Sequence, residues 1–436
     1  MSELSYLEKL LDGAEVEWVA LNKLATFLKG KSLPKEKITP DGNRYCIHYG
    51  ELFTHYGPII DKVCSKTNQA INESILSEKN DVLMPTSDVT PRGLATASCI
   101  QESGVILGGD ILIIRCSGVD GRYLSNFIIN NKKKILQMVK GSTVYHLYAK
   151  DIGKLLIPIP CPNNPEKSLA IQSEIVRILD TFSALTAELT AELNMRKKQY
   201  NYYRDQLLSF DEEQEKPIYL EKLLDGVEVE WKMLGEVIHS LKTGLNPRQN
   251  FSLNTLDAQG YYVTVREIQN GKVVFLDKTD RVNDRALKII NGRSNLEAGD
   301  ILFSGTGTVG RIAVIEENPI NWNIKEGVYT IKPIKEKIAP RFLSYLLQSS
   351  KIVKDYSKKI VGNPVISLPM GDLKKLLIPI PCPGNPEKSL AIQSEIVRIL
   401  DKFDTLTNSI TEGLPREIEL RQKQYEYYRD LLFSFP

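Results

Sequence analysis

Residues 305–310 read Gly-Thr-Gly-Thr-Val-Gly and match the Gly-x-Gly-x-x-Gly pattern that binds the pyrophosphate of a dinucleotide. That chemistry needs a helix directly after the glycines and an acidic residue about 20 positions later. Residues 311–315 instead read Arg-Ile-Ala-Val-Ile, a short β-branched run that is typical of a strand. The motif therefore predicts a hairpin turn, whose threonine hydroxyls and backbone amides can hold a phosphate or a base edge.

Other patterns that carry out catalysis are missing or incomplete. The sequence has no Gly-x-x-x-x-Gly-Lys-Ser/Thr loop, and none of its Asn-Pro pairs is followed by the second proline of an amino-methyltransferase. Residues 230–232 resemble a nuclease Glu-x-Lys, but the twin segment at residues 17–19 ends in valine. His48 and His55 have no acidic or cysteine partner at ligand spacing, and the six cysteines form no Cys-x-x-Cys pair. We therefore expect no catalytic site, no metal site and no disulfide framework.

An internal repeat reveals the elements that must position any binding residues. Three segments occur twice almost unchanged: residues 6–18 and 219–231, 154–180 and 375–401, and 198–205 and 423–430. Between them, residues 19–153 and 232–374 diverge. Short similar segments remain, such as Asp81-Val-Leu-Met with Asp300-Ile-Leu-Phe, and Gly141-Ser-Thr-Val with Gly362-Asn-Pro-Val. The alternation of variable regions and constant segments predicts one fold that carries two different surfaces.

Each constant segment predicts a long helix. Asn164, Pro165 and Glu166 supply an N-cap, a first-turn proline and an acidic residue near the positive helix end. The first helix should run from Pro165 to about Ser209, whereas a kink or break is expected in the second at Gly413-Leu-Pro415.

Apolar residues recur along both helices at alternating steps of four and three, which is a heptad seam. The seam residues are Ile171, Ile175, Ile178, Phe182, Leu185 and Leu189 in the first copy and Ile392, Ile396, Ile399, Phe403, Leu406 and Ile410 in the second. A stripe this narrow is unstable alone in water, so we expect the two helices to pack on each other as a coiled coil. A parallel pair is possible, but an antiparallel pair gives the duplicated chain a pseudo-twofold axis and is favoured.

The variable regions predict mixed domains. Strand-like runs lie at residues 261–265, 273–276 and 300–304, and a short helical pattern lies at residues 340–347. The expected fold class is α+β, with two such domains joined by the antiparallel coiled coil. Residues 211–217 are acidic and end in proline, which indicates a solvated connector.

Charge divides the chain in the same way as the repeat. The net charge is +2, but residues 19–160 hold 18 Lys/Arg against 12 Asp/Glu, and residues 232–381 hold 22 against 14. The remaining residues hold 16 against 28, so basic variable regions alternate with acidic constant segments. This separation favours contact between the variable regions and a polyanion, while the helices face another partner.

The constant motifs carry a family resemblance. Two divergent regions alternate with copies of Leu-Ile-Pro-Ile-Pro, Ile-Gln-Ser-Glu-Ile-Val-Arg-Ile-Leu-Asp and Lys-Gln-Tyr-x-Tyr-Tyr-Arg-Asp. The pattern resembles the specificity subunit of a type I restriction–modification enzyme, in the subfamily with tandem Thr-Ala-Glu-Leu repeats. Residues 186–189 and 190–193 form such a pair. The second helix lacks the pair, so the two arms are not strict copies.

The resemblance implies a division of the chain into five parts. These are an N-terminal constant segment at residues 1–18, target recognition domains at residues 19–160 and 232–381, a central constant segment at residues 161–231 and a C-terminal constant helix segment at residues 382–436. Each recognition domain would read one half of a bipartite DNA site. The helices would set the spacer and dock modification subunits.

The resemblance also implies partners and a location. Two modification subunits would carry the S-adenosylmethionine chemistry, and restriction subunits would supply the ATP-dependent translocase and nuclease with their magnesium. This chain would hold no cofactor, catalyse nothing and work in the bacterial cytoplasm. No apolar run approaches the roughly 18 residues of a membrane span. The alternatives are a standalone DNA methyltransferase with its own recognition domains and a coiled-coil scaffold without a DNA role.

Candidate DNA contacts are basic, hydroxyl or aromatic residues of the variable regions, beside glycine or aromatic neighbours. The candidates are Lys29, Lys31, Arg44, Tyr49, Arg92 and Arg122 in the first region and Lys242, Thr243, Arg248, Arg266, Thr306, Thr308 and Arg311 in the second.

Overall fold

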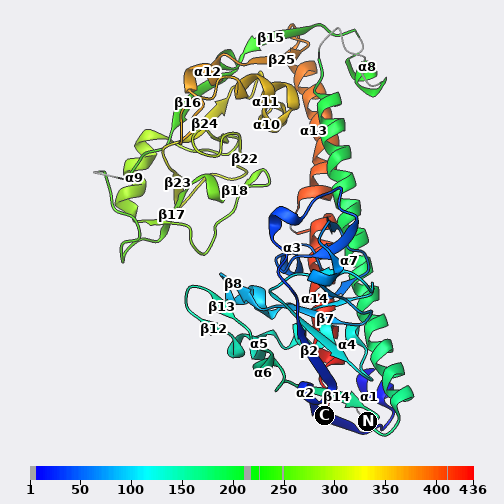
Figure 1. Cartoon of the computed structure of the whole chain (residues 1–436). Helices are drawn as coiled ribbons and strands as arrows, with labels where there is room; N and C mark the ends of the chain where they lie inside the picture. The colour runs from blue at the N-terminus through cyan, green and yellow to red at the C-terminus, as the bar shows by residue number, and fades with distance from the viewer. Residues whose placement is uncertain (1–5, 211–217, 225, 248–249, 410) are drawn as a thin grey trace. The chain divides into compact units, whose positions relative to one another are not determined.

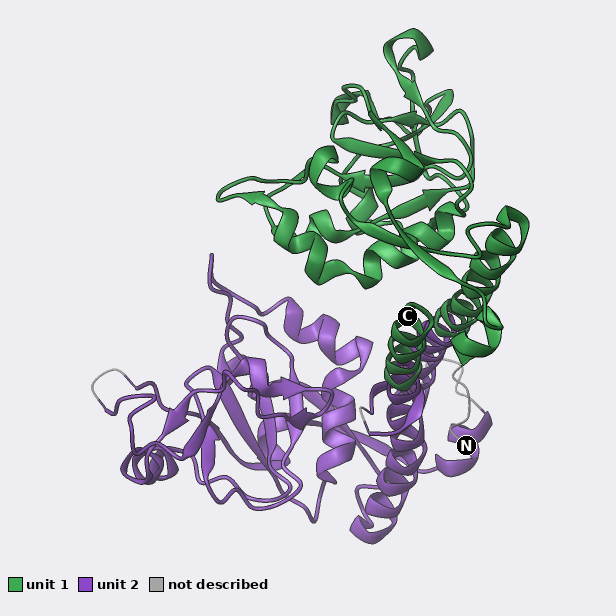
Figure 2. Ribbon diagram, turned by 90° about the horizontal axis from the view of Figure 1, so that it is seen from below, with its two compact units in different colours: residues 1–188, 419–436 green, residues 189–418 purple. Residues whose placement is uncertain are grey.

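The computed structural model describes residues 6–436 except for 211–217, 225, 248–249 and 410. The acidic connector, Arg248 and Ile410 therefore lie outside the described residues. The chain forms two compact units, residues 1–188 with 419–436 and residues 189–418 (Figure 2). Each unit contains one variable region together with parts of both constant helices.

The central sheet of unit 1 has five strands. Their order is β2 (Ala25–Lys29), β11 (Ile111–Cys116), β7 (Val82–Pro85), β9 (Ser98–Ile100) and β4 (Ile59–Ile60). Val82 and Met84 face one hydrophobic core, while Leu83 between them faces another. Because both faces of the sheet are covered, β7 is apolar along its whole length.

Smaller elements surround this sheet. Two further sheets contain β5 (Ser65–Thr67), β3 (Arg44–Ile47), β10 (Ile106–Leu107) and β6 (Ile75–Leu76), and β12 (Lys140–Gly141), β13 (Tyr145–His146) and β8 (Ser87–Asp88). The helices are α1 (Tyr6–Leu11), α2 (Leu21–Leu24), α3 (Glu51–Thr54), α4 (Gly121–Asn130), α5 (Lys132–Met138) and α6 (Ala149–Ile152), with 3-10 turns at Lys35–Lys37, Ile71–Glu73 and Pro91–Ala95. The hairpin of β12 and β13 projects from unit 1 on the side away from the long helix α7 (Pro165–Leu207) (Figure 1).

Unit 2 has a similar plan. Its sheets contain β16 (Ile238–Thr243), β24 (Val328–Pro333), β21 (Ile301–Ser304) and β22 (Ile312–Val314); β20 (Arg281–Val282), β17 (Gly260–Val263) and β23 (Trp322–Ile324); and β18 (Ile268–Gln269) with β19 (Lys272–Val273). The helices are α8 (Ile218–Leu224), α9 (Asp284–Arg293), α10 (Pro340–Gln348), α11 (Ser350–Ser357) and α12 (Met370–Lys374), with 3-10 turns at Leu234–Glu236 and Val265–Glu267. The expected α+β class is confirmed, and β17, β21 and α10 lie where the sequence predicts them. The strand expected at residues 273–276 is wrong beyond Val273, because β19 ends there and residues 274–276 are irregular.

The repeated segments pair with each other at the base of each variable region. The antiparallel pairs are β1 (Val16–Ala20) with β14 (Leu156–Pro160), and β15 (Val229–Met233) with β25 (Leu377–Pro381). Their registers are equivalent, since Trp18 lies opposite Pro158 and Trp231 lies opposite Pro379. The ends of each variable region are thus held together by constant residues, whatever sequence lies between them.

Buried carboxylates show that the two variable regions share one fold. Asp81 precedes β7 and pairs with Arg115 of β11 at 2.8 Å, and Asp300 precedes β21 and pairs with Lys332 of β24 at 3.3 Å. Each carboxylate also accepts the backbone amide three residues earlier. A buried charge is expensive without such partners, so the pairs hold equivalent strands in equivalent positions.

The second constant helix is divided where the sequence predicts a kink or break. Helix α13 (Pro386–Asn408) ends before α14 (Gly413–Leu432) begins. Gly413 has a φ of +78°, which glycine adopts without a steric penalty. Pro415 lies in the first turn of α14, where its missing amide removes no helical hydrogen bond.

Aromatic contacts define how the constant helices pack. In unit 1, Phe182 of α7 stacks on Tyr428 of α14, with ring centroids 5.0 Å apart. In unit 2, Tyr203 of α7 stacks on Phe403 of α13 at 5.5 Å. Phe182 corresponds to Phe403 in the repeat, and Tyr203 to Tyr428. Each unit therefore joins its part of α7 to its part of the second constant helix through one pair of stacked rings.

The seam residues have two kinds of partner. The first two seam residues of each copy are buried in the hydrophobic core of their own unit. These are Ile171 and Ile175 in unit 1 and Ile392 and Ile396 in unit 2. Ile178 and Ile399 pack against the same cores while partly exposed. Phe182 and Phe403 make the aromatic contacts between helices, and Leu185, Leu189 and Leu406 are half-buried. The N-terminal part of each stripe therefore packs in the core of a variable region, and the aromatic residue that follows contacts the other constant helix.

A glutamine in each copy of the repeat also joins a constant helix to a variable region. The Gln172 side-chain carbonyl accepts the amide of Asp120 at 2.9 Å, at the start of α4. Gln393 accepts the amide of Ala339 at 2.8 Å, at the start of α10. Each glutamine satisfies a backbone donor that the first turn of the helix leaves without a helical partner.

The C-terminal end of the chain should be a major source of stability for unit 1. Phe433 is 6 % exposed, and its ring lies 5.5 Å from those of both Tyr123 and Phe127. We expect Phe433→Ala to lower the free energy of unfolding by about 3–5 kcal/mol, because it leaves a cavity among aromatic rings. The control Tyr427→Ala, at a 64 % exposed position, should change it by less than about 1 kcal/mol. Urea denaturation measures both, and equal losses would contradict this account.

Candidate nucleic-acid interface

The glycine-rich turn of unit 2, residues 305–310, joins β21 to β22, which pair antiparallel. The predicted hairpin is therefore confirmed, and a strand follows the glycines where a dinucleotide site needs a helix. The Ser304 hydroxyl accepts the amide of Arg311 at 2.7 Å and closes the turn. Gly305 packs against the Tyr329 ring, where a Cβ would lie 2.0 Å from a ring carbon. Close packing thus explains this glycine without a nucleotide.

The structure brings three predicted contact residues of unit 2 together. Arg266 and Thr306 line one cleft of about 670 Å³, together with Lys325. Thr243 adjoins them, because its hydroxyl accepts the amide of Gly327, 3.0 Å away, and Gly327 also lines the cleft. Asp280 and Glu326 line the same cleft, and Arg266 pairs with Asp280 at 3.5 Å, so the recess combines hydroxyl groups with two cations and two carboxylates. Arginine and hydroxyl groups can hydrogen-bond a phosphate or a base edge.

The remaining candidates of unit 2 are more dispersed. Arg311 lies beside the cleft, since its guanidinium donates to the carbonyl of Val265 at 3.0 Å. Thr308 is exposed in the glycine-rich turn. Lys242 lines a different recess with Lys332, on the other side of β16 from Thr243.

Two candidates of unit 1 lie near a comparable cleft. Tyr49 lines a cleft of about 740 Å³ together with His48, Asp88, Val89 and Val144. The Gly50 amide donates to His48 Nδ1 at 3.2 Å, and burial lowers the pKa of His48, which favours the neutral ring. Arg92 is exposed in the 3-10 turn that follows β8.

The other candidates of unit 1 lie apart from that cleft. Lys29 pairs with Asp110 at 3.8 Å, and Lys31 forms an isolated β-bridge with Gly108. Arg44 is exposed on β3.

Arg122 has contacts that point to a structural role. Its guanidinium pairs with Asp120 at 2.8 Å and lines a recess along α7 with Asp180. The equivalent Arg341 of unit 2 pairs with Asp401 of α13 at 2.6 Å. In both units, therefore, this arginine faces a constant helix.

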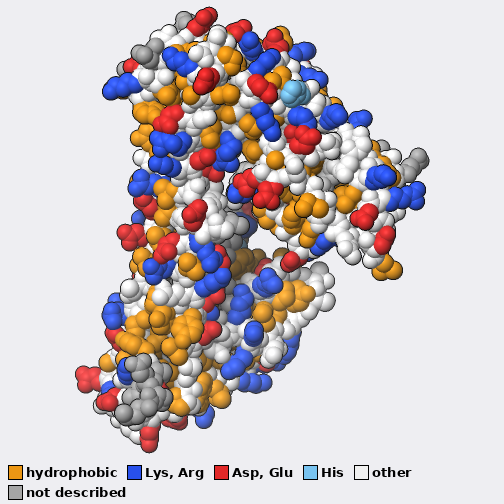
Figure 3. Space-filling view, turned by 180° about the vertical axis from the view of Figure 1, so that it is seen from behind, with side chains coloured by type: hydrophobic (Ala, Val, Ile, Leu, Met, Phe, Trp, Pro, Cys, Tyr) orange, Lys and Arg blue, Asp and Glu red, His pale blue; other side chains and the backbone are white. Residues whose placement is uncertain are grey.

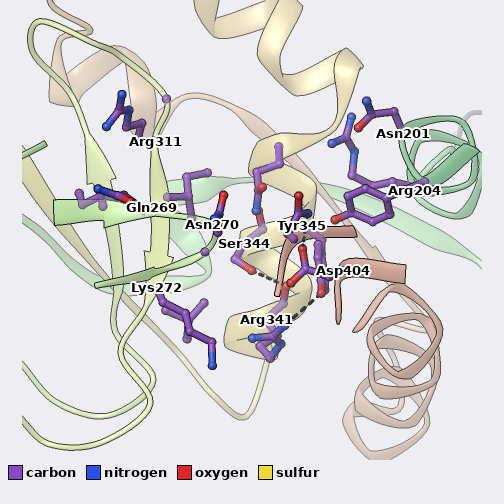
Figure 4. Close-up of a pocket in the computed structure, with 18 of the residues that line it drawn as sticks. Asn201, Arg204, Gln269, Asn270, Lys272, Arg311, Arg341, Ser344, Tyr345 and Asp404 are labelled. Atoms are coloured by element: carbon purple, nitrogen blue, oxygen red, sulfur yellow. Dashed lines mark hydrogen bonds between the residues drawn. The ribbon is translucent and has the colours of Figure 1, made fainter. Parts of the chain in front are cut away.

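A second basic recess in unit 2 was not predicted from the sequence. It has a volume of about 650 Å³ and is lined by Lys197 and Arg204 of α7, Lys272 of β19, Arg311, and Arg341 of α10 (Figure 4). Asp404 is the acidic residue among those that line it, and burial raises its pKa. Two of the cations lie in a constant helix, whereas the charge pattern of the sequence placed the expected DNA contacts in the variable regions alone.

Surface charge does not mark one continuous binding stripe on the face shown in Figure 3, where basic and acidic side chains are interspersed. Among the described residues, no group of three His, Cys, Asp or Glu side chains is arranged to hold a metal ion. None of the described helices is long and apolar enough to cross a membrane. The six cysteines are free thiols.

Comparison with known proteins places the chain in a family. The model for the type I restriction modification DNA specificity domain matches residues 14–196 and 227–420. The EcoR124I/EcoR124II specificity subunit of Escherichia coli is 36 % identical, over 100 % of this chain and 98 % of that one. The EcoprrI specificity subunit of Escherichia coli is 32 % identical, over 94 % and 93 %. Neither relative is named as a methyltransferase or a scaffold, the two alternatives considered above.

Solved structures agree at the level of the fold. The crystal structure of the S subunit of a type I restriction-modification system from M. genitalium aligns with a TM-score of 0.52 and 18 % identity, over 98 % of both chains. A chain from a study of complex assembly in the type I R-M system aligns with a TM-score of 0.60 and 14 % identity, over 96 % of this chain and 97 % of that one. Since the family model spans both halves and close relatives span the whole length, the chain belongs to the non-catalytic specificity subunits of type I restriction–modification enzymes.

Proposed function

We propose that this chain reads a bipartite DNA sequence for a type I restriction–modification complex. Residues 19–160 and 232–381 each act as a target recognition domain for one half-site. The observation that carries the proposal is that equivalent strands, closed at the base by equivalent constant strands, support different side chains at their outer loops. A shared scaffold with divergent loops allows two domains to recognise different sequences in the same kind of ligand.

The constant segments have the complementary role in this proposal. Residues 1–18, 161–231 and 382–436 hold the recognition domains and dock two modification subunits, which bind S-adenosylmethionine. Restriction subunits join that complex and use ATP and magnesium, so this chain needs no cofactor of its own. The names of the Escherichia coli relatives support a restriction-system role, and we place the complex in the bacterial cytoplasm.

The tandem Thr-Ala-Glu-Leu pair, residues 186–193, acts as a ruler for the spacer. It lies within α7, and its leucines, Leu189 and Leu193, are half-buried. Each copy adds about 6 Å to the helix at about 1.5 Å per residue. Duplex DNA rises about 3.4 Å per base pair, so one copy corresponds to one or two pairs.

DNA contact is tested first at the cleft of unit 2. Arg266→Ala should weaken binding to the specific duplex by about 1–3 kcal/mol and relax one position of the second half-site. Lys374→Ala, an exposed cation of α12 away from the cleft, is the control and should leave the half-site unchanged. Binding titrations on the specific and single-mismatch duplexes measure the effect. Equal behaviour of the two variants would remove Arg266 from the interface.

The ruler is tested by removing residues 190–193. We expect the spacer to shorten by one or two base pairs with both half-sites intact, because the helix loses about one turn. Sequencing of methylated sites in a host that expresses the variant with its modification partner gives the spacer. Thr190→Ala keeps the helix length and should keep the spacer. An unchanged spacer in an active deletion complex would show that the repeat sets no distance.

A further inference from the structure

The same backbone arrangement recurs at the outer edge of both variable regions. In unit 1, the Leu147 amide donates to the carbonyl of Thr86, just after β7, at 3.0 Å. In unit 2, the Leu368 amide donates to the carbonyl of Gly305, just after β21, at 2.8 Å. Both leucines are buried. One hydrogen bond thus fastens a loop that follows a central strand to a second segment more than 60 positions later.

That second segment is a hairpin with equivalent geometry in both units. Lys140 pairs with His146 in unit 1, and Val361 pairs with Ser367 in unit 2. Each hairpin turns on a glycine with positive φ, Gly141 at +128° and Gly362 at +104°. A Cβ on either would lie 2.1 or 2.3 Å from a backbone oxygen across the turn, so another residue would distort it.

The two segments of each unit also pair with each other. Ser87 lies opposite His146 in unit 1, and Thr306 lies opposite Ser367 in unit 2. We call residues 86–90 with 140–146 the loop pair of unit 1, and residues 305–309 with 361–367 the loop pair of unit 2.

Side chains at the tips of the loop pairs are exposed and differ between the units. Val144 and Val365 are shared and are 45 % and 63 % exposed. Elsewhere Ser142 corresponds to Asn363, and Val89, which is 72 % exposed, corresponds to Thr308. Exposed valines repeated at the tips of two divergent regions suggest a surface that another molecule covers.

We infer that each loop pair is the element that enters the major groove, and that the positions at which the two differ set the two half-sites. This rests on the proposed role in DNA recognition. The major groove admits a two-stranded β-ribbon, which matches a projecting hairpin such as that of β12 and β13 (Figure 1). Serine, threonine and asparagine can bond base edges, and valine can contact the methyl group of thymine.

Neighbouring residues support this assignment. In unit 1, Val89 and Val144 line the same cleft as Tyr49 and the cation Lys35. In unit 2, Thr306 of the loop pair lines the cleft that holds Arg266 and Lys325. Carboxylates line both clefts as well, Glu51 and Asp88 in unit 1 and Asp280 and Glu326 in unit 2. Lys35 in unit 1 and Lys325 in unit 2 are exposed lysines of these clefts that can hold a phosphate beside the bases that the loop pair reads.

Reciprocal exchanges between the loop pairs test the inference. Ser142→Asn should change the preference at one position of the first half-site alone, and Asn363→Ser should do so in the second alone. Val89→Thr, a second exchange in unit 1, should also act on the first half-site. The change should be about fivefold or more, the lower end for one base contact. The readout is methylated-site sequencing in a host that expresses each variant with the modification partner.

Leu156→Thr is the matched control, because Leu156 is 51 % exposed on β14 at the base of the same region. It should leave both half-sites unchanged. Active complexes of Ser142→Asn, Val89→Thr and Asn363→Ser that all retain their original half-sites would overturn the inference, while the proposed function would stand. If the unmodified chain directs methylation to no bipartite site, the proposed function itself fails.

Discussion

The two pairs of stacked aromatic rings between the constant helices form the interaction on which the rest of the structure depends. Phe182 stacks on Tyr428, and Phe403 stacks on Tyr203, so each copy of the repeat supplies the ring that the other needs. A single narrow stripe of apolar residues cannot hold a 43-residue helix in water. The duplicated sequence therefore provides a partner for each helix within one chain.

The variable regions depend on this frame in turn. Their ends are fixed by the paired base strands, and the first turns of α4 and α10 are capped by Gln172 and Gln393 of the constant helices. Since constant residues make these contacts in both units, the outer loops can change without altering how a region is attached. A change of DNA sequence preference then requires a new set of loop side chains and not a new fold.

The sequence predicted the features that strict local patterns encode. Heptad spacing and an N-terminal proline identified α7, Gly413 and Pro415 marked the division of the second helix, and β-branched residues after the glycine-rich motif identified the hairpin. The pairing of the repeated segments with each other was not predicted, because pairing depends on contacts between residues about 140 positions apart, on which local patterns carry no information.

Only part of the candidate interface could be predicted from the sequence, for the same reason. Thr243, Arg266 and Thr306 converge in unit 2, but residue type alone could not separate them from Arg122, which faces α7. The equivalence of the loop pairs emerged from hydrogen-bond registers, since their side chains differ. Gly141 and Gly362 were the visible signal, because the turn that they share requires glycine in both units.

Independence of the two recognition domains is the central claim, and a chimera tests it most directly. Residues 19–153 would be replaced by the corresponding region of a relative that reads a different sequence. Methylated sites would then be sequenced in a host that supplies the modification partner. The account predicts a new first half-site, with the second half-site and the spacer unchanged. A folded, active chimera in which both half-sites change would contradict it.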